Sequence, residues 1–110
     1  MTTNYQLVSI YLNEADQWEG RPLYLEVLQF LKRSGCAGGA VLRGVAGYTA
    51  SADVATTSPV DIERKPPLVV QFFDRVEKIS EVLPQLRVMA GARLITLLDV
   101  HVIPPEPPKG

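Results

Sequence analysis

The segment LVVQFFDRVEKISEVL, residues 68–83, passes directly from a strand pattern to a helix pattern and decides the fold. Residues 68–73 are apolar except for Gln71, which is typical of a strand with both faces buried. Asp74 is placed to cap the next helix, and Glu77 completes a capping-box pattern that satisfies two unbonded N–H groups. The segment therefore predicts a strand followed at once by a helix.

The predicted helix ends at Gly91, because glycine is a common C-terminal stop. Its buried stripe consists of apolar residues at helical spacing: Ile79, Val82, Leu83, Leu86 and Met89. Pro84 lies inside the helix and predicts a kink or a restart, since proline has no N–H to donate. Residues 94–103 predict a further strand, with Val100 and Val102 pointing inward.

Upstream, residues 5–13 alternate with a period of two and predict a strand. One face of this strand carries Val8, Ile10 and Leu12, and the other carries Leu7, Ser9 and Tyr11. Pro22 suits the first position of a helix that Gly35 ends. Residues 40–48 predict a strand that Gly44 and Gly47 interrupt, and the polar residues 49–67 predict a long functional loop, part of which can extend the strands into a ribbon.

The order strand, helix, strand, strand, helix, strand predicts an α+β fold of the ferredoxin-like, split βαβ type. Its four-stranded antiparallel sheet carries both helices on one face. The other face should then be polar, yet the strands are apolar on both faces, as Leu7 beside Val8 and Val69 beside Val70 show. An uncovered apolar face predicts a homo-oligomer.

Composition sets further limits on the class of protein. The 110 residues carry 11 Lys and Arg against 12 Asp and Glu, a net charge of −1, which excludes a basic nucleic-acid binder. We expect one domain over residues 1–103 and a proline-rich tail over residues 104–110. With no long apolar stretch and no basic start followed by an apolar run, we expect a cytoplasmic protein without membrane insertion. A single Cys36 and a single His101 predict no zinc site.

The segment VLRGVAGY, residues 41–48, is the strongest candidate for a binding site. Its glycines let backbone N–H groups approach an anion, and Arg43 supplies charge and a bidentate fork. The structural alternative is a strand with glycines in a bulge and an arginine on the surface. An RNA-recognition motif is disfavoured because Val45 and Gly47 stand where aromatic residues should stack. An acylphosphatase would place its phosphate loop before the first helix, and no set of nucleophile and base predicts an enzyme.

Three ordered blocks carry a family resemblance: IYLNEAD at residues 10–16, EGRPLY at residues 19–24 and GGAVLRGVAGY at residues 38–48. Together they resemble the uncharacterised PII-like family, a domain of unknown function. The resemblance implies a trimer related to PII signalling proteins, which bind adenine nucleotides between subunits and regulate transporters or enzymes through a mobile loop. It implies a ligand-binding bend that consists of Arg43, Gly44, Val45, Ala46, Gly47 and Tyr48. It also places a phosphate-binding turn at Gly91, Ala92 and Arg93.

The leading hypothesis is a non-enzymatic, homotrimeric PII-like regulator whose cleft between subunits binds a small anion, such as ATP, ADP or AMP. Arg43 and Arg93 would pair with phosphate or carboxylate groups, and Tyr48 could stack on a base. The partner would be a transporter or an enzyme, contacted through the loop after the second strand. The alternative is an interaction module that binds no ligand and acts through its trimer surface, which Asp53 and Ala55 favour because many family members carry Arg and His there.

Overall fold

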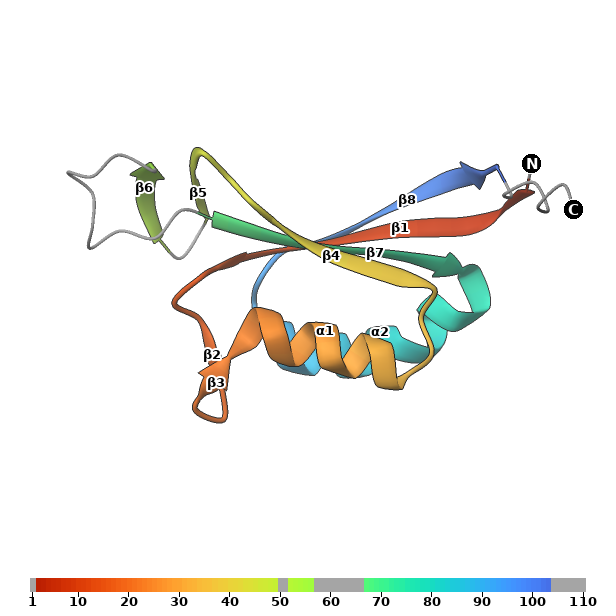
Figure 1. Ribbon diagram of the computed structural model, residues 1–110, viewed down its shortest axis with the longest axis horizontal. Helices are drawn as coiled ribbons and strands as arrows, with labels where there is room; N and C mark the ends of the chain where they lie inside the picture. Colours follow the sequence, from red (N-terminus) through yellow and green to blue (C-terminus); the bar gives the residue numbers. More distant parts are fainter. Residues whose placement is uncertain (1, 50–51, 57–66, 104–110) are drawn as a thin grey trace, which may run out of the picture.

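A four-stranded antiparallel sheet carries two helices on one face in the computed structural model, which describes residues 2–49, 52–56 and 67–103 (Figure 1). The elements in chain order are β1 (Thr2–Asn13), β2 (Gln17–Trp18), β3 (Arg21–Pro22), α1 (Leu23–Arg33), β4 (Gly38–Arg43), β5 (Ala46–Thr49), β6 (Ala52–Thr56), β7 (Pro67–Arg75), α2 (Val76–Ala90) and β8 (Ile95–Val102). The sheet order is β4-β7-β1-β8. The predicted ferredoxin-like fold is therefore confirmed.

The core lies between the sheet and the two helices. The β1 residues Val8, Ile10 and Leu12 are almost fully buried, as the period-two pattern predicts. In register they face the β7 residues Phe72, Val70 and Leu68, which are equally buried. Helix α1 contributes Leu23, Val27 and Leu31, and α2 contributes Ile79, Val82, Leu86, Met89 and Ala90. Each helix therefore buries one apolar stripe on the same face of the sheet.

The start of α2 differs from the prediction. Asp74 belongs to β7 and caps nothing, because the N-cap residue is Arg75 and no side chain bonds there. The Asp74 carboxylate instead accepts the N–H of Arg75 at 2.7 Å and the N–H of Ala37 at 2.8 Å. The predicted capping box is therefore wrong, because Asp74 ties β7 to the segment before β4.

Helix α2 also continues through Pro84 to Ala90, so the predicted restart is wrong. Proline removes one N–H from the helix, and the carbonyl that loses this partner belongs to Ser80, one turn earlier. Both Ser80 and Pro84 are exposed residues, so water can replace the missing hydrogen bond. Gly91 ends the helix with a positive φ of 60°, as predicted. No helix in the described ranges is long and apolar enough to cross a bilayer.

The predicted second strand is two strands, β4 and β5, separated at Gly44. Strands β5 and β6 pair with each other and form the ribbon expected for part of the polar segment. Figure 1 shows this ribbon projecting beyond one end of the main sheet. A second small hairpin, β2–β3, has no counterpart in the sequence prediction. Residues 57–66 of the polar loop and the proline-rich tail at residues 104–110 lie outside the described residues.

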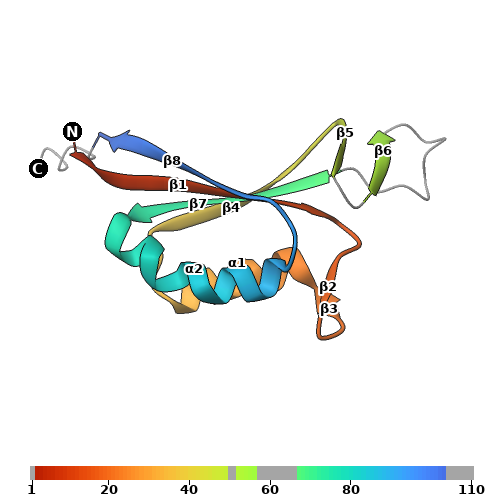
Figure 2. The same cartoon turned by 180° about the vertical axis from the view of Figure 1, so that it is seen from behind.

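Both helices lie on one side of the sheet, so neither covers the opposite face, called the open face below (Figure 2). This face exposes large apolar side chains. Leu7 stands between Phe73 and Leu98 in register across three strands, and Phe73 and Leu98 are exposed by 38% and 62%. Tyr11 and Leu42 lie on the same face and are also exposed. The predicted uncovered apolar face is thus present in the folded chain.

The prediction that Val100 and Val102 point inward is wrong. Val100 pairs with Tyr5 and lies on the open face, and Val102, two residues later on the same strand, shares that face. The apolar character of both valines therefore adds to the open face rather than to the core.

Candidate functional site

The antiparallel topology brings the two predicted arginines to the same end of the sheet. Strands β1 and β4 run in the same direction, because both pair antiparallel with β7, and β8 runs opposite to β1. The end of β1, the end of β4 and the start of β8 therefore lie at the same end of the sheet, with β4 and β8 on its opposite edges (Figure 1). Arg43 is the last residue of β4, and Arg93 lies two residues before β8. We call this region, with Arg43 and Arg93, the arginine end.

Arg43 already has a carboxylate partner. Its Nη2 donates to Oε1 of Glu14 at 2.5 Å, and Glu14 belongs to the turn that follows β1. The Arg43 side chain is 56% exposed, whereas that of Glu14 is 22% exposed. This pair thus leaves much of the guanidinium accessible to solvent.

Arg93 pairs with a second carboxylate from the same turn. Its Nε donates to Oδ2 of Asp16 at 2.8 Å, and its Nη1 donates to the Ala90 carbonyl at 3.2 Å. The Asp16 oxygen also accepts the N–H of Asn13 at 2.8 Å. Both side chains are less exposed than Arg43, at 29% for Arg93 and 17% for Asp16.

These contacts perturb the pKa values of both partners. Burial alone would raise the pKa of Asp16, but the Arg93 hydrogen bond, the Asn13 N–H and the Arg93 charge outweigh it, so the pKa is lowered. The hydrogen bond to Asp16 raises the pKa of Arg93 against the opposing effect of burial. Both groups are therefore held in their charged forms.

A third arginine, which sequence reasoning missed, fixes the turn between α2 and β8. Arg87 Nη1 donates to the carbonyls of Gly91 and Arg93, at 2.8 and 2.9 Å. The Arg93 N–H donates to the Ala90 carbonyl at 3.0 Å, and the Gly91 N–H donates to the Arg87 carbonyl at 3.0 Å. The turn expected to bind phosphate is therefore held in one shape by its own hydrogen bonds.

In the glycine-containing bend, the close backbone contact is with β7 of the protein itself, and not with an anion as predicted. The Gly44 N–H donates to the Pro67 carbonyl at 2.8 Å, and a Cβ on Gly44 would lie 3.1 Å from Pro67 Cγ. Gly44 therefore fits against β7, and its observed partner is the protein itself. Val45 is 74% exposed. The backbone of Ala46, Gly47 and Tyr48 belongs to β5, and the Tyr48 side chain lies outside the described part, so its stacking role stays a prediction.

Comparison with known protein families matches residues 5–102 to DUF190, described as "Uncharacterized ACR, COG1993". The chain belongs to the DUF190 family. Among similar relatives, the UPF0166 protein MJ1524 of Methanocaldococcus jannaschii is 35% identical over 101 residues, which covers 88% of this chain and 90% of the relative. A UPF0166 protein of Aquifex aeolicus is 33% identical over 98 residues, covering 89% and 92%.

Solved structures share the fold of this DUF190 chain. CPII of Thiomonas intermedia K12, bound to ADP and bicarbonate, has a TM-score of 0.61 at 16% identity and covers 89% of this chain and 87% of that one. A nitrogen regulatory PII-like structure of the same CPII, bound to ADP, AMP and bicarbonate, has a TM-score of 0.59 at 14% identity, covering 93% and 96%. The divalent ion tolerance protein CutA1 of Ehrlichia chaffeensis reaches 0.62 at 6% identity, covering 94% and 88%. The DUF190 chain therefore has a PII-like fold.

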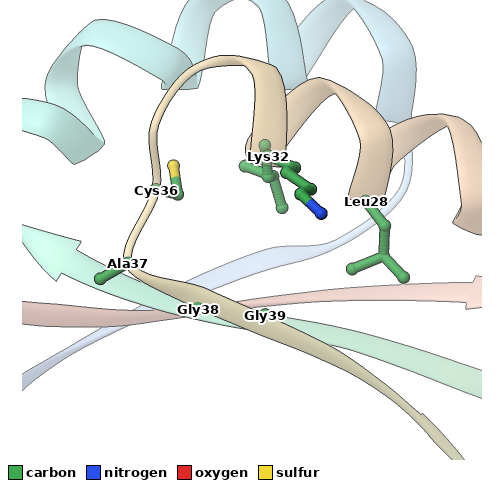
Figure 3. Close-up of a pocket in the computed structure, with 7 residues that line it drawn as sticks. Leu28, Lys32, Cys36, Ala37, Gly38 and Gly39 are labelled. Atoms are coloured by element: carbon green, nitrogen blue, oxygen red, sulfur yellow. The ribbon is translucent and has the colours of Figure 1, made fainter.

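The DUF190 chain also has a pocket away from the arginine end. It has a volume of about 360 Å³, lies between α1 and the start of β4, and is lined by Leu28, Leu31, Lys32, Cys36, Ala37, Gly38 and Gly39 (Figure 3). Burial, together with the negative charge of Asp74, raises the pKa of the Cys36 thiol, and Lys78 only partly offsets this. The thiol is therefore less ionised at neutral pH than an ordinary cysteine.

His101 is exposed on β8, and the described residues contain no group of three or more side chains that could hold a metal ion.

Sequence reasoning placed the arginines but assigned no role to Glu14 and Asp16. The structure makes them the partners of both arginines. No spacing in the sequence marks these pairs, which join residues 29 and 77 positions apart. A predicted strand order would have indicated these pairs, because it places the turn after β1 at the same end of the sheet as the end of β4 and the start of β8.

Proposed function

We propose that this chain is a non-enzymatic PII-like regulator that binds a small anionic ligand, an adenine nucleotide, at the arginine end. The observation that carries this proposal is that Arg43 and Arg93 lie at the same end of the sheet and pair with two carboxylates of one turn, Glu14 and Asp16. Guanidinium groups bind phosphate and carboxylate through charge-assisted, often bidentate, hydrogen bonds. The ligand-binding residues would be Arg43, Gly44, Val45, Ala46, Gly47, Tyr48, Gly91 and Arg93.

The choice of an adenine nucleotide is supported by proteins of the same fold. CPII, which shares the PII-like fold, has been solved with ADP and bicarbonate, and with ADP, AMP and bicarbonate. Every one of these ligands carries a negative charge. With a net charge of only −1, this chain offers no general positive field, so recognition would depend on the two placed arginines.

A homotrimer is the second part of the proposal, and the open face supports it. Leu42, Phe73 and Leu98 expose apolar surface that neither α1 nor α2 covers. Leu42 lies on this face at the end of β4, whereas Arg43, the next residue, is in register with the buried Leu68 and points to the helix side. A second copy packed against Leu42 would therefore reach Arg43 around the end of β4. The ligand cleft and the subunit interface would thus adjoin each other.

The response to the ligand would pass through the segment after β4. Strands β5 and β6 project from the arginine end, so a ligand at Arg43 would sit at the base of this ribbon (Figure 1). We infer that the ribbon and the residues after it contact the partner, a transporter or an enzyme, in the cytoplasm.

A second candidate function, an interaction module that binds no ligand, has its own support. Both arginines already carry carboxylate partners, and Asp53, in β6, contributes a negative charge where the family resemblance implies a positive one. Such a module would act through its trimer surface alone. Titration with nucleotides separates the two functions, because the module would assemble normally and bind none of them.

The proposal is tested by isothermal titration calorimetry of the full chain with ATP, ADP, AMP and bicarbonate. We expect saturable binding of an adenine nucleotide, weakened about tenfold or more by Arg43→Ala and by Arg93→Ala, because each removes a hydrogen bond to a charged group. Arg33→Ala is the matched control, since Arg33 lies in the last turn of α1 and removes the same charge elsewhere. Binding that is unaffected by the first two variants contradicts the site, and the absence of binding to every compound contradicts the function.

A further inference from the structure

One short turn neutralises both arginines of the proposed ligand site. This turn, residues 13–16, is called the acidic loop below. Its Glu14 pairs with Arg43, and its Asp16 pairs with Arg93. The two arginines come from different parts of the chain, before the β5–β6 ribbon and after α2. A ligand that binds both guanidinium groups therefore competes with both carboxylates of the same loop.

The acidic loop has a defined shape of its own. Asp16 N–H donates to the Asn13 carbonyl at 3.0 Å, and Ala15 N–H donates to the Asn13 side-chain oxygen at 2.9 Å. The Asp16 carbonyl accepts the N–H of Leu23, the first residue of α1, at 2.9 Å. These bonds hold the loop between β1 and α1, so its carboxylates are presented to the arginines at little further cost in conformational entropy.

We propose that the acidic loop is an internal competitor for the ligand, so that anion binding at Arg43 and Arg93 requires the release of Glu14 and Asp16. This inference rests on the proposed function and adds its regulation. The ligand would exchange one carboxylate–guanidinium pair for one phosphate–guanidinium pair at each arginine. Affinity would then be set by the difference between two similar interactions rather than by the full strength of either.

Competition at two arginines also selects the class of ligand. A nucleoside diphosphate or triphosphate carries several negative oxygens and can replace both carboxylates in one binding event. A small anion with a single charge, such as bicarbonate, replaces only one of them. The acidic loop would therefore favour polyanionic nucleotides over single small anions.

Release of the loop would be transmitted to its neighbour. Asp16 is followed directly by the β2–β3 hairpin, whose Trp18 packs partly buried against the core. Trp18 is the only tryptophan in the chain, so its emission reports on this hairpin alone. Ligand binding that displaces Asp16 would thus change the Trp18 spectrum.

The test is calorimetric titration of ADP into the full chain and into Glu14→Gln and Asp16→Asn, with Trp18 emission recorded in parallel. Each variant keeps the size of the side chain but removes the competing charge. We expect about threefold tighter binding for Glu14→Gln and about tenfold for Asp16→Asn, whose pair is less exposed. Glu19→Gln is the control, because Glu19 is exposed in the β2–β3 hairpin, next to the acidic loop, and forms neither pair.

The outcomes separate this inference from the proposed function. ADP binding that is tighter in Glu14→Gln and Asp16→Asn, but not in Glu19→Gln, supports the inference. The same result supports it if the wild-type chain binds ADP too weakly to measure. Unchanged or weaker ADP binding in both variants overturns the inference and leaves the nucleotide function standing. No ADP binding by the wild type or by either variant overturns both. Glu14→Gln, which alters the more exposed pair, keeps the test valid if Asp16→Asn fails to fold.

Discussion

Replacement of Asp16 by Asn should lower the stability of the chain and make this loss depend on pH. The Asp16 carboxylate accepts hydrogen bonds of 2.8 Å from Arg93 Nε and from the Asn13 N–H. A hydrogen bond to a charged group contributes about 1.5–3 kcal/mol, but Asn keeps one acceptor oxygen, and solvent at the partly exposed Arg93 screens the charge. We therefore expect the free energy of unfolding to fall by about 1–2 kcal/mol at neutral pH.

The pH dependence follows from the lowered pKa of Asp16. In the folded state this pKa lies below its ordinary value of 3.8, so the ionised carboxylate is favoured by folding. Its stabilising contribution is complete above that value and disappears as the pH falls through the lower folded-state pKa. Urea denaturation of wild type and Asp16→Asn at about pH 7 and about pH 3 should thus give a difference that shrinks in acid.

The comparison with Glu19→Gln makes this prediction specific. That control removes one negative charge from the adjacent β2–β3 hairpin without affecting the Arg93 pair, and we expect a change of less than about 0.5 kcal/mol. Two results would refute the reasoning. One is an equal free energy of unfolding of wild type and Asp16→Asn at neutral pH, and the other is a difference between them that is the same at both pH values.

Three further predictions concern assembly, core and thiol. Leu98→Lys places a charge on the open face and should reduce the mass in light scattering from about three times 12.1 kDa to 12.1 kDa. Val88→Lys, on the exposed surface of α2, should leave the trimer intact, and a trimer in both variants contradicts the interface. Phe72→Ala should lower the free energy of unfolding by about 3–5 kcal/mol in urea titrations, and a loss below about 1 kcal/mol would contradict its place in the core. Cys36 should react with a disulfide reagent more slowly than a free cysteine at about pH 8, because its pKa is raised, and an equal rate would contradict that shift.

Much of the fold can be predicted from local patterns, because each face of β1 is encoded by alternate residues. Val8, Ile10 and Leu12 are buried and Tyr11 is exposed, as their period-two spacing indicates. The capping box at Asp74 fails for the opposite reason. Its local pattern is correct, but Asp74 accepts the N–H of Ala37, 37 positions away, and β7 continues through Arg75, which pairs with Tyr5 of β1.

In the candidate site, too, local patterns identify some residues, whereas the tertiary fold determines their partners. The sequence indicates that Arg43 and Arg93 suit an anion, because guanidinium beside glycine is a local chemical pattern. Their partners Glu14 and Asp16 depend on the order β4-β7-β1-β8, which brings three strand ends together. Likewise, Arg87 can be assigned to the turn after α2 only when its two carbonyl acceptors are located in space.

The most direct test of the account is a crystal structure of the full chain grown with ADP. We expect the diphosphate to contact Arg43 and Arg93 in a cleft between two copies packed through the open face, with Glu14 and Asp16 released from both arginines. A structure in which ADP binds elsewhere, or in which the Arg43–Glu14 and Arg93–Asp16 pairs persist beside bound ADP, would contradict it.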